Sequence, residues 1–420
     1  MKPHRQDAIW TRNFTLLCLT NLAFFLSAHM LTPILPVYLL QIGGRSRDVG
    51  YVMGAYTIGA LVMRPLAGRM VDSLGRKRIA VLALVAAVAI TVFYRYAASV
   101  PALMLVRGLH GLAFGVIGTA IGTIVADVLP AGRFSEGMGY FGLTASLSMA
   151  ISPTVGFWLV NGAGFSVMFI GVVLMMVLSL GFCLPVQSTD HLVVNRGGTV
   201  RAATGSRRRK PALLERTALP ASGIMFFVAT IFGTVLSFVS LYAAEQGIAN
   251  IGPFFTANAL AMLATRLFAG RWDDSGSTER VLAVAHLSLL AGVVALGFSS
   301  SMAGFVLAGG LIGLGFGFFI PTLQSLAVRG VPANRRGAAT GTFFISMDLG
   351  IGLGTIVSGL VAEFTGYRTM FFATLVSLAL AAVLAYVSRS ARFRGLGGGS
   401  DLAPRSLEAN LPLSDTREQA

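Results

Sequence analysis

The sequence predicts an all-α membrane protein: 12 transmembrane helices arranged as two six-helix parallel repeats around a central cavity. Of the 420 residues, 55% are apolar and only 12% are charged, which is about half the charged share of a soluble domain. Apolar stretches of the roughly 20 residues that a membrane helix needs recur along the chain. The chain also aligns with itself at one constant offset, which indicates a duplication.

The predicted helices follow one another with short connections, except for one polar stretch near the middle. The first six are expected at 14–40, 49–70, 79–98, 101–126, 137–160 and 165–186. The second six are expected at 219–246, 249–271, 281–299, 302–328, 337–363 and 367–388. The chain therefore divides into an N-terminal segment (1–13), a first half (14–186), a basic linker (187–218), a second half (219–388) and a C-terminal tail (389–420).

The basic residues predict how the chain lies in the membrane. The net charge of +15 would indicate nucleic acid as the partner of a soluble protein. With the N-terminus inside, however, most Lys and Arg fall in the tails and the inner loops, as the positive-inside rule requires. We therefore expect a multi-pass protein of the cell membrane with both termini cytoplasmic and no nucleic-acid partner. Arg207–Lys210 in the linker then anchors the topology, with a regulatory contact as the alternative.

The duplication is visible when the chain is shifted by 202 residues. Residues 50–73 and 252–275 share nine identities in 24 positions without a gap, including Arg64/Arg266 and Asp72/Asp274. Repeats of six helices run parallel and are related by an axis along the membrane normal, with substrate sites near the midplane between them. The sequence therefore predicts a secondary transporter. It has neither a phosphate-binding loop nor a His-Glu-x-x-His motif, so we expect no enzyme, no cofactor and no metal site.

The loop after the helix 49–70 carries a recognisable motif, Gly68-Arg-Met-Val-Asp-Ser-Leu-Gly-Arg-Lys-Arg78. It resembles the loop signature of the major facilitator superfamily, although Ser73 stands where that family commonly has Arg. A degenerate copy, Gly270–Asp274, occupies the equivalent loop of the second half. In that family the loop latches the two halves together on the cytoplasmic side. The resemblance extends over about residues 14–388.

The resemblance implies a conformational latch and two specific contacts. Asp72 is expected to face the chain near Gly337, and Arg76 is expected to pair with Asp127. The alternative is that the basic residues of this loop are only a topology signal. The latch residues implied by the resemblance are Gly68, Asp72, Gly75, Arg76, Asp127 and Asp274.

Three titratable groups inside predicted helices are candidates for proton coupling. Arg107-Gly-Leu-His110-Gly in the helix 101–126 resembles a second signature of the superfamily, with His110 in place of Gln, and in proton-coupled relatives this Arg is implicated in coupling. Asp348 is the only carboxylate well inside a predicted helix, and such groups are functional by default. Each group also has a structural alternative. Asp348 is then neutralised by a structural arginine or caps a helix. Arg107 pairs with helix carbonyls, and His110 is a hydrogen-bonded core residue.

The helix 137–160 partly matches the drug:proton antiporter branch of the superfamily. It keeps Gly139, Pro153 and Gly156, which are expected to pack this helix closely, but has Ser148 and Ser152 where the branch has glycine. The family's cavity is lined mainly by the first, fourth, seventh and tenth helices. By that resemblance, the expected lining residues are Asn21, Phe25, His29, Phe227, Phe238 and Gln324. For His29 the alternative is packing with one backbone hydrogen bond.

Together these features predict a proton-coupled efflux antiporter. The expected cargo is a small amphipathic molecule, either a drug-like compound or a metallophore-type metabolite, moved by alternating access. A proton-coupled importer of an organic anion or sugar remains the alternative. The expected partners are a small-molecule substrate, protons and the lipid bilayer, and we expect a monomer.

Overall fold

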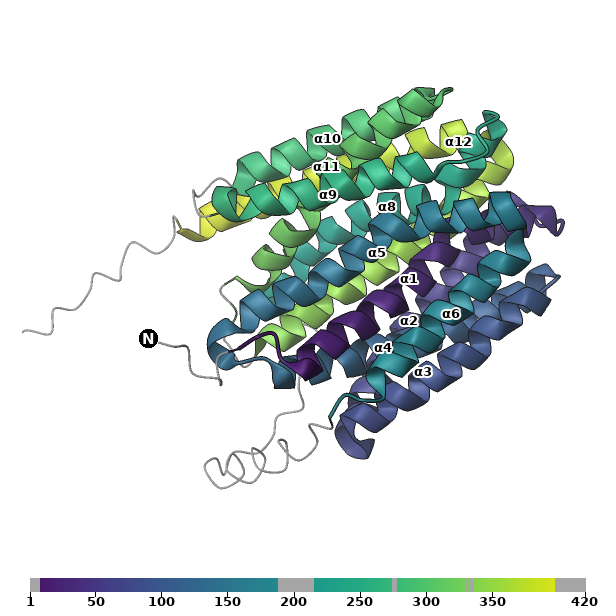
Figure 1. Cartoon of the computed structure of the whole chain (residues 1–420). Coiled ribbons are helices and arrows are strands. Elements are labelled where there is room, and N and C mark those ends of the chain that lie inside the picture. Colours follow the sequence, from purple (N-terminus) through teal and green to yellow (C-terminus); the bar gives the residue numbers. More distant parts are fainter. Residues whose placement is uncertain (1–7, 188–214, 274–277, 330, 332–334, 397–420) are drawn as a thin grey trace, which may run out of the picture.

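The computed structural model describes residues 8–187, 215–273, 278–329, 331 and 335–396 (Figure 1). In this part the chain forms 11 α-helices and three short 3-10 helices, with no strand. Nine helices of the described part are long and apolar enough to cross a membrane. The architecture agrees with the predicted all-α membrane class.

The helices follow the predicted order, with boundaries that differ by a few residues. The N-terminal half contains α1 (Arg12–Gln41), α2 (Ser46–Leu74), α3 (Arg76–Phe93), α4 (Val100–Val128), α5 (Phe134–Ala163) and α6 (Phe165–Cys183). The C-terminal half contains α8 (Leu219–Glu245), α9 (Gly252–Asp273), α10 (Thr278–Phe298), α11 (Met302–Val328) and α12 (Arg336–Leu396). Gly366, with φ 82° and ψ 166°, bends α12 into two arms that correspond to the last two predicted spans.

The 202-residue repeat is also present in three dimensions. Ser99 caps the start of α4 and Ser301 caps the start of α11 in the same way, each accepting a bond from the backbone three residues on. Gly164 turns α5 into α6 at φ 84°, and its counterpart Gly366 makes the bend in α12. Both turns need the left-handed region that glycine adopts without strain. The two halves therefore share local structure as well as sequence.

Within each half, one glycine contact brings two helices to the closest possible distance. A methyl group on Gly111 of α4 would collide with the backbone of Tyr56 in α2. At the equivalent positions of the repeat, a methyl group on Gly313 of α11 would collide with the backbone of Asn258 in α9. Small residues allow such backbone contact in membrane helices. The α2–α4 and α9–α11 pairs are thus the same packing unit, used twice.

The two halves meet at one end of the bundle. We call the end at which α1 begins the proximal end, and the opposite end the distal end. Contacts between the halves in the distal part include Ser46 with Tyr367 (2.9 Å) and Thr154 with Thr256 (2.9 Å). One of the two buried apolar clusters contains residues of both halves, whereas the other lies in the N-terminal half alone.

Towards the proximal end the facing surfaces of the halves separate. Gly50, Gly54 and Thr57 of α2 contact α12, and helical spacing continues this face to Gly68. Ile356 and Gly352 define the facing side of α12, which continues to Gly341. A methyl group on Gly68 or on Gly341 would find no described atom within 4 Å. The described structure is therefore closed distally and open proximally.

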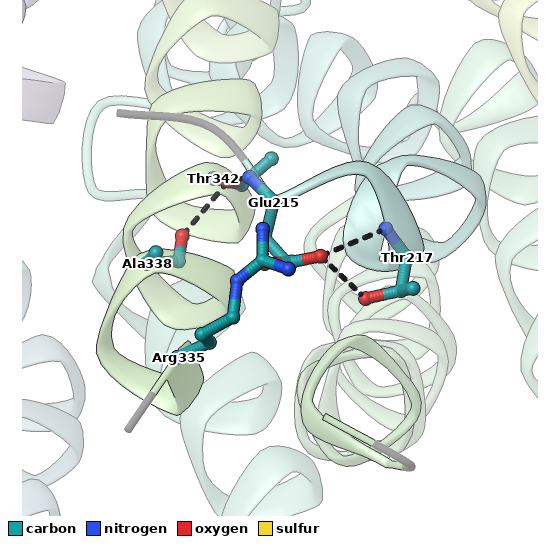
Figure 2. A network of polar contacts seen from close by, with 5 residues as sticks. All are labelled: Glu215, Thr217, Arg335, Ala338 and Thr342. Carbon is teal, nitrogen blue, oxygen red and sulfur yellow. Dashed lines mark hydrogen bonds and ion pairs between the residues drawn. The ribbon is translucent and has the colours of Figure 1, made fainter. Parts of the chain in front are cut away.

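The chain that enters α8 is fixed to α12 by a buried glutamate (Figure 2). Glu215 is 3% exposed, and its carboxylate pairs with Arg335 at 2.8 Å. It also accepts a hydrogen bond from the hydroxyl of Thr217 at 3.0 Å, while its backbone N–H donates to Thr342 at 2.9 Å. These contacts hold the proximal ends of α8 and α12 together, so the two helices form one unit there.

Candidate functional site

An ion pair joins the two halves where their contact surface ends. The Nε of Arg64 in α2 lies 2.9 Å from Oδ2 of Asp348 in α12, and the two side chains are 31% and 11% exposed. Gly350 and Gly354 let α12 lie directly on the α8 backbone, and Gly352 meets Thr57 of α2. This close packing brings Asp348 to Arg64. Neutralisation by an arginine was the structural alternative for Asp348. Such an arginine is present in this conformation, and it belongs to the opposite half.

Arg107 lies on α4 in the interior of the N-terminal half. It is 1% exposed, and its guanidinium lies 4.0 Å from the centre of the Tyr56 ring. Nη2 donates to the Thr32 hydroxyl at 3.4 Å. Its Nε and Nη1 have no hydrogen-bond partner among the described residues. The pairing with helix carbonyls that was the alternative for Arg107 is absent from this part of the chain.

His110 is fully buried next to Arg107. Its Nδ1 lies 3.0 Å from the Tyr94 hydroxyl, and its ring meets the edges of the Tyr56 and Tyr94 rings. The neighbouring Gly111 presses this turn of α4 against α2. These contacts match the core position that was the alternative for His110.

The predicted lining residues of α1 make polar and aromatic contacts inside the N-terminal half. Asn21 donates to the Thr144 hydroxyl at 2.7 Å, and Nδ1 of His29 lies 2.9 Å from the Ser148 hydroxyl. Both bonds connect α1 to α5. The alternative for His29 was packing with one hydrogen bond to the backbone. Its partner is instead a side chain, the Ser148 hydroxyl. Phe25 meets Phe114 of α4 edge to face.

The predicted lining residues of the C-terminal half have different environments. Phe227 and Gln324 are half-buried. Phe238 is 0% exposed and belongs to the apolar cluster shared by both halves. It therefore lines no open space in this conformation, because it lies on the distal part of α8 where the halves are closed.

In α5 the small residues have unequal surroundings. A methyl group on Gly156 would collide with Ile34 of α1, so this glycine packs closely as predicted. Pro153 is buried next to it. Gly139 has no described atom near its missing side chain. The predicted close packing at Gly139 is absent here because it lies at the open proximal end.

The described residues include part of the predicted latch. Arg76 at the start of α3 pairs with Asp127 near the end of α4, as the resemblance implied. Gly75 adopts φ 95° and makes the tight turn from α2 to α3. The side chain of Asp72, the surroundings of Gly337, and Asp274 lie outside the described residues. The Arg76–Asp127 pair lies within one half, so a role as a latch between halves remains a prediction.

The comparisons with known proteins agree with this architecture. The sequence model of the Major Facilitator Superfamily matches residues 17–355 and 247–415. The chain belongs to the major facilitator superfamily. The predicted all-α membrane fold class and the family are thereby confirmed, whereas the exact number of 12 membrane helices stays a prediction; the relatives are transporters and not enzymes. This superfamily member is thus a multi-pass membrane protein whose relatives bind small molecules.

Individual relatives are distant but cover nearly the whole chain. The staphylopine export protein of Staphylococcus aureus (strain Mu50 / ATCC 700699) is 25% identical over 364 residues, 85% of this chain and 91% of its own. An uncharacterized MFS-type transporter of Pseudomonas aeruginosa (strain LESB58) is 29% identical over 416 residues, 93% of this chain and 98% of its own. The crystal structure of a POT family transporter in complex with 5-aminolevulinic acid has a TM-score of 0.72 at 16% identity, covering 92% of this chain and 98% of that one.

Proposed function

We propose that this transporter is a proton-coupled efflux antiporter of the cell membrane, which exports small amphipathic molecules by alternating access. The observation that carries the proposal is the Arg64–Asp348 pair, which joins the two halves at 2.9 Å. Protonation of Asp348 would remove its charge and hence the ion pair. A single proton can in this way change the contact between the halves.

The position of the pair favours exchange over co-transport. Because α2 and α12 belong to different halves, the pair forms only while the distal end is closed. An empty carrier with a charged Asp348 is therefore held in the proximally open state. It leaves that state after protonation or after a substrate has separated the pair. In an exchanger, holding the empty carrier in one state prevents uncoupled cycling. A symporter, in contrast, must return its empty carrier to the opposite state in every cycle.

The direction of transport follows from the predicted orientation. If the termini are cytoplasmic, the proximal opening faces the cytoplasm and the paired Asp348 represents the carrier after proton release. A proton that enters through the carrier can then drive substrate outwards. One charge crossing the membrane potential supplies about 2.3 kcal/mol per 100 mV, before any pH difference is added. The carrier would work as a monomer, with substrate, protons and the bilayer as its partners.

The relatives support export of a metabolite or drug-like compound. The Staphylococcus aureus relative is named an export protein for staphylopine. Among the described residues, aromatic side chains gather beside Arg107, with Tyr56 and Phe114 at 5.2 Å and Phe25 and Phe114 at 5.8 Å between ring centres. Such rings suit the flat apolar part of an amphipathic molecule.

Import of an organic anion is the second candidate, and Arg107 is the observation that favours it. A buried guanidinium without an acidic partner in the described residues can attract an anion from either side of the membrane. The sign of proton movement separates the two candidates. In energised inside-out vesicles, exporting antiport makes the lumen less acidic when substrate is added, whereas symport makes it more acidic.

The test uses such vesicles with an acidity-sensitive dye. Lipophilic cations, antibiotics, sugar analogues and metal chelates are added to vesicles with the natural protein or with Asp348→Asn. We expect proton release with at least one compound, its loss in Asp348→Asn, and its retention in Glu136→Gln. The control removes a carboxylate that pairs within one half, with Arg133. Proton release that persists in Asp348→Asn would refute the coupling role of Asp348.

A further inference from the structure

One buried site in the N-terminal half contains several nitrogen atoms that have no hydrogen-bond acceptor. Nε and Nη1 of Arg107 and Nε2 of His110 have no hydrogen-bond partner among the described residues. Tyr56 contacts both side chains, with 4.0 Å from its ring centre to the guanidinium and 5.4 Å to the imidazole centre. The three nitrogens therefore lie around one aromatic ring, next to one another on α4.

These nitrogens form a consistent set of donors. The two Arg107 nitrogens always carry hydrogen. If Nδ1 of His110 accepts the Tyr94 hydroxyl, at 3.0 Å, the neutral ring carries its hydrogen on Nε2. A buried charge that lacks a partner costs several kcal/mol. The stacking on Tyr56, one long bond to Thr32 and a hydrogen bond with Tyr94 offset only part of this cost, so the remaining donors indicate a binding site for an anion.

Tyr56 separates the buried site around Arg107 and His110 from the space between the halves. Tyr56 is half-buried, whereas Arg107 behind it is 1% exposed. The phenol also lies within electrostatic range of Arg64 and Asp348, which join the halves. A rotation of this one ring would therefore connect the guanidinium to the transport path. The backbone of Tyr56 cannot move with it, because Gly111 is packed directly against that backbone.

We infer that Arg107 binds a carboxylate of the transported molecule, with His110 as a second donor and the Tyr56 ring as a movable cover. A carboxylate matches the planar fork of a guanidinium. It would satisfy Nε or Nη1, in each case together with Nη2, because the hydrogens of Nε and Nη1 lie on different edges of the group. The neighbouring Phe25 and Phe114 select a flat apolar body attached to it. The substrate class is thus an aromatic or similarly flat carboxylate. This inference rests on the proposed function only in that the bound molecule is the one transported.

The test measures binding without transport. Purified protein in lipid nanodiscs is heated with two pairs of probes: indole-3-acetate with indole-3-acetamide, and N-acetyltryptophan with its amide. Each pair keeps the ring and removes only the carboxylate. We expect a saturable rise in unfolding temperature of about 2 °C or more with at least one of the two carboxylates and none with the amides. Arg107→Gln should abolish the rise, and Arg107→Lys should reduce it.

The controls keep the inference open to refutation. Arg133→Gln, which removes an exposed arginine far from Tyr56 in sequence, should respond like the natural protein. Equal effects of carboxylate and amide in both pairs, or a rise that persists in Arg107→Gln, would overturn the inference. Without any probe, Arg107→Gln should unfold at or above the natural temperature, whereas a purely structural arginine predicts a lower temperature. Since no proton movement is measured here, failure of this test is distinct from failure of proton antiport.

Discussion

Replacing Asp348 by Asn should shift the carrier towards its distally open state. At 2.9 Å and an effective dielectric constant of about 20, two unit charges attract by about 6 kcal/mol. The removal of water from both groups offsets most of this attraction, and Arg64 keeps 31% of its side chain exposed. A net effect of about 1–3 kcal/mol remains, which corresponds to a change of about 5- to 150-fold in the conformational equilibrium.

A cysteine on the closed interface can report this shift. Ser240 of α8 is 3% exposed and lines a small cavity between the halves, together with Asn161 and Ile251. The natural Cys18 and Cys183 are both buried and unbridged, and alanine can replace them. With Ser240→Cys in that background, the labelling rate by a membrane-impermeant maleimide added to intact cells measures opening of the distal end.

The expected result is labelling about 5- to 150-fold faster with Asp348→Asn than without it. Arg64→Gln should have the same effect, and the double variant should add little, since both changes remove one interaction. Glu136→Gln is the matched control and should leave the rate unchanged. An unchanged rate in folded Asp348→Asn protein would show that the pair does not hold the distal end closed, and the argument for exchange would fail with it.

Three further perturbations test other parts of the structure. Gly111→Ala should lower stability by about 1–3 kcal/mol through overpacking against Tyr56, whereas Gly139→Ala should change it by less than about 0.5 kcal/mol; equal unfolding temperatures in lipid would contradict this packing. Arg335→Gln should cost about 1–3 kcal/mol because the buried Glu215 carboxylate would keep only its hydrogen bonds from Thr217, and a loss no larger than for Arg133→Gln would remove the clamp between α8 and α12. Asp72→Asn should slow transport without lowering the unfolding temperature, and a natural turnover rate would remove Asp72 from the latch.

Much of the fold could be predicted because its signals are local. Length and apolarity mark the helices, and the constant offset between Arg64 and Arg266 marks the repeat. The Arg76–Asp127 contact was predicted from a motif. The Arg64–Asp348 pair was not predicted, although both residues are visible as rare charges in apolar helices. In helices that are apolar on all sides, periodicity does not fix which face meets which neighbour.

The same limitation applies to the candidate site. The sequence singles out Arg107, but the ring that covers it belongs to Tyr56, an ordinary aromatic residue in α2. The only sequence signal for this contact is Gly111, because a glycine in a helix interior often marks a close neighbour. The burial of Phe238 and the empty surroundings of Gly139 depend on which end of the bundle is closed. That is a property of one conformation, and a sequence that must support both conformations cannot specify it.

The ion pair also makes the two contact surfaces between the halves unequal. Shifted by one repeat, Arg64 becomes Arg266, but Asp348 becomes Ser146. Charges therefore join α2 to α12, through Arg64–Asp348 and through Arg45–Glu363 at 3.9 Å. The described contacts between α5 and α9 join uncharged groups instead, as in the stacked rings of Phe157 and Phe255. Under the proposed function, a proton on Asp348 would weaken the α2–α12 edge of the closure and leave the α5–α9 edge intact. We therefore expect the halves to separate first between α2 and α12 and to pivot about α5 and α9.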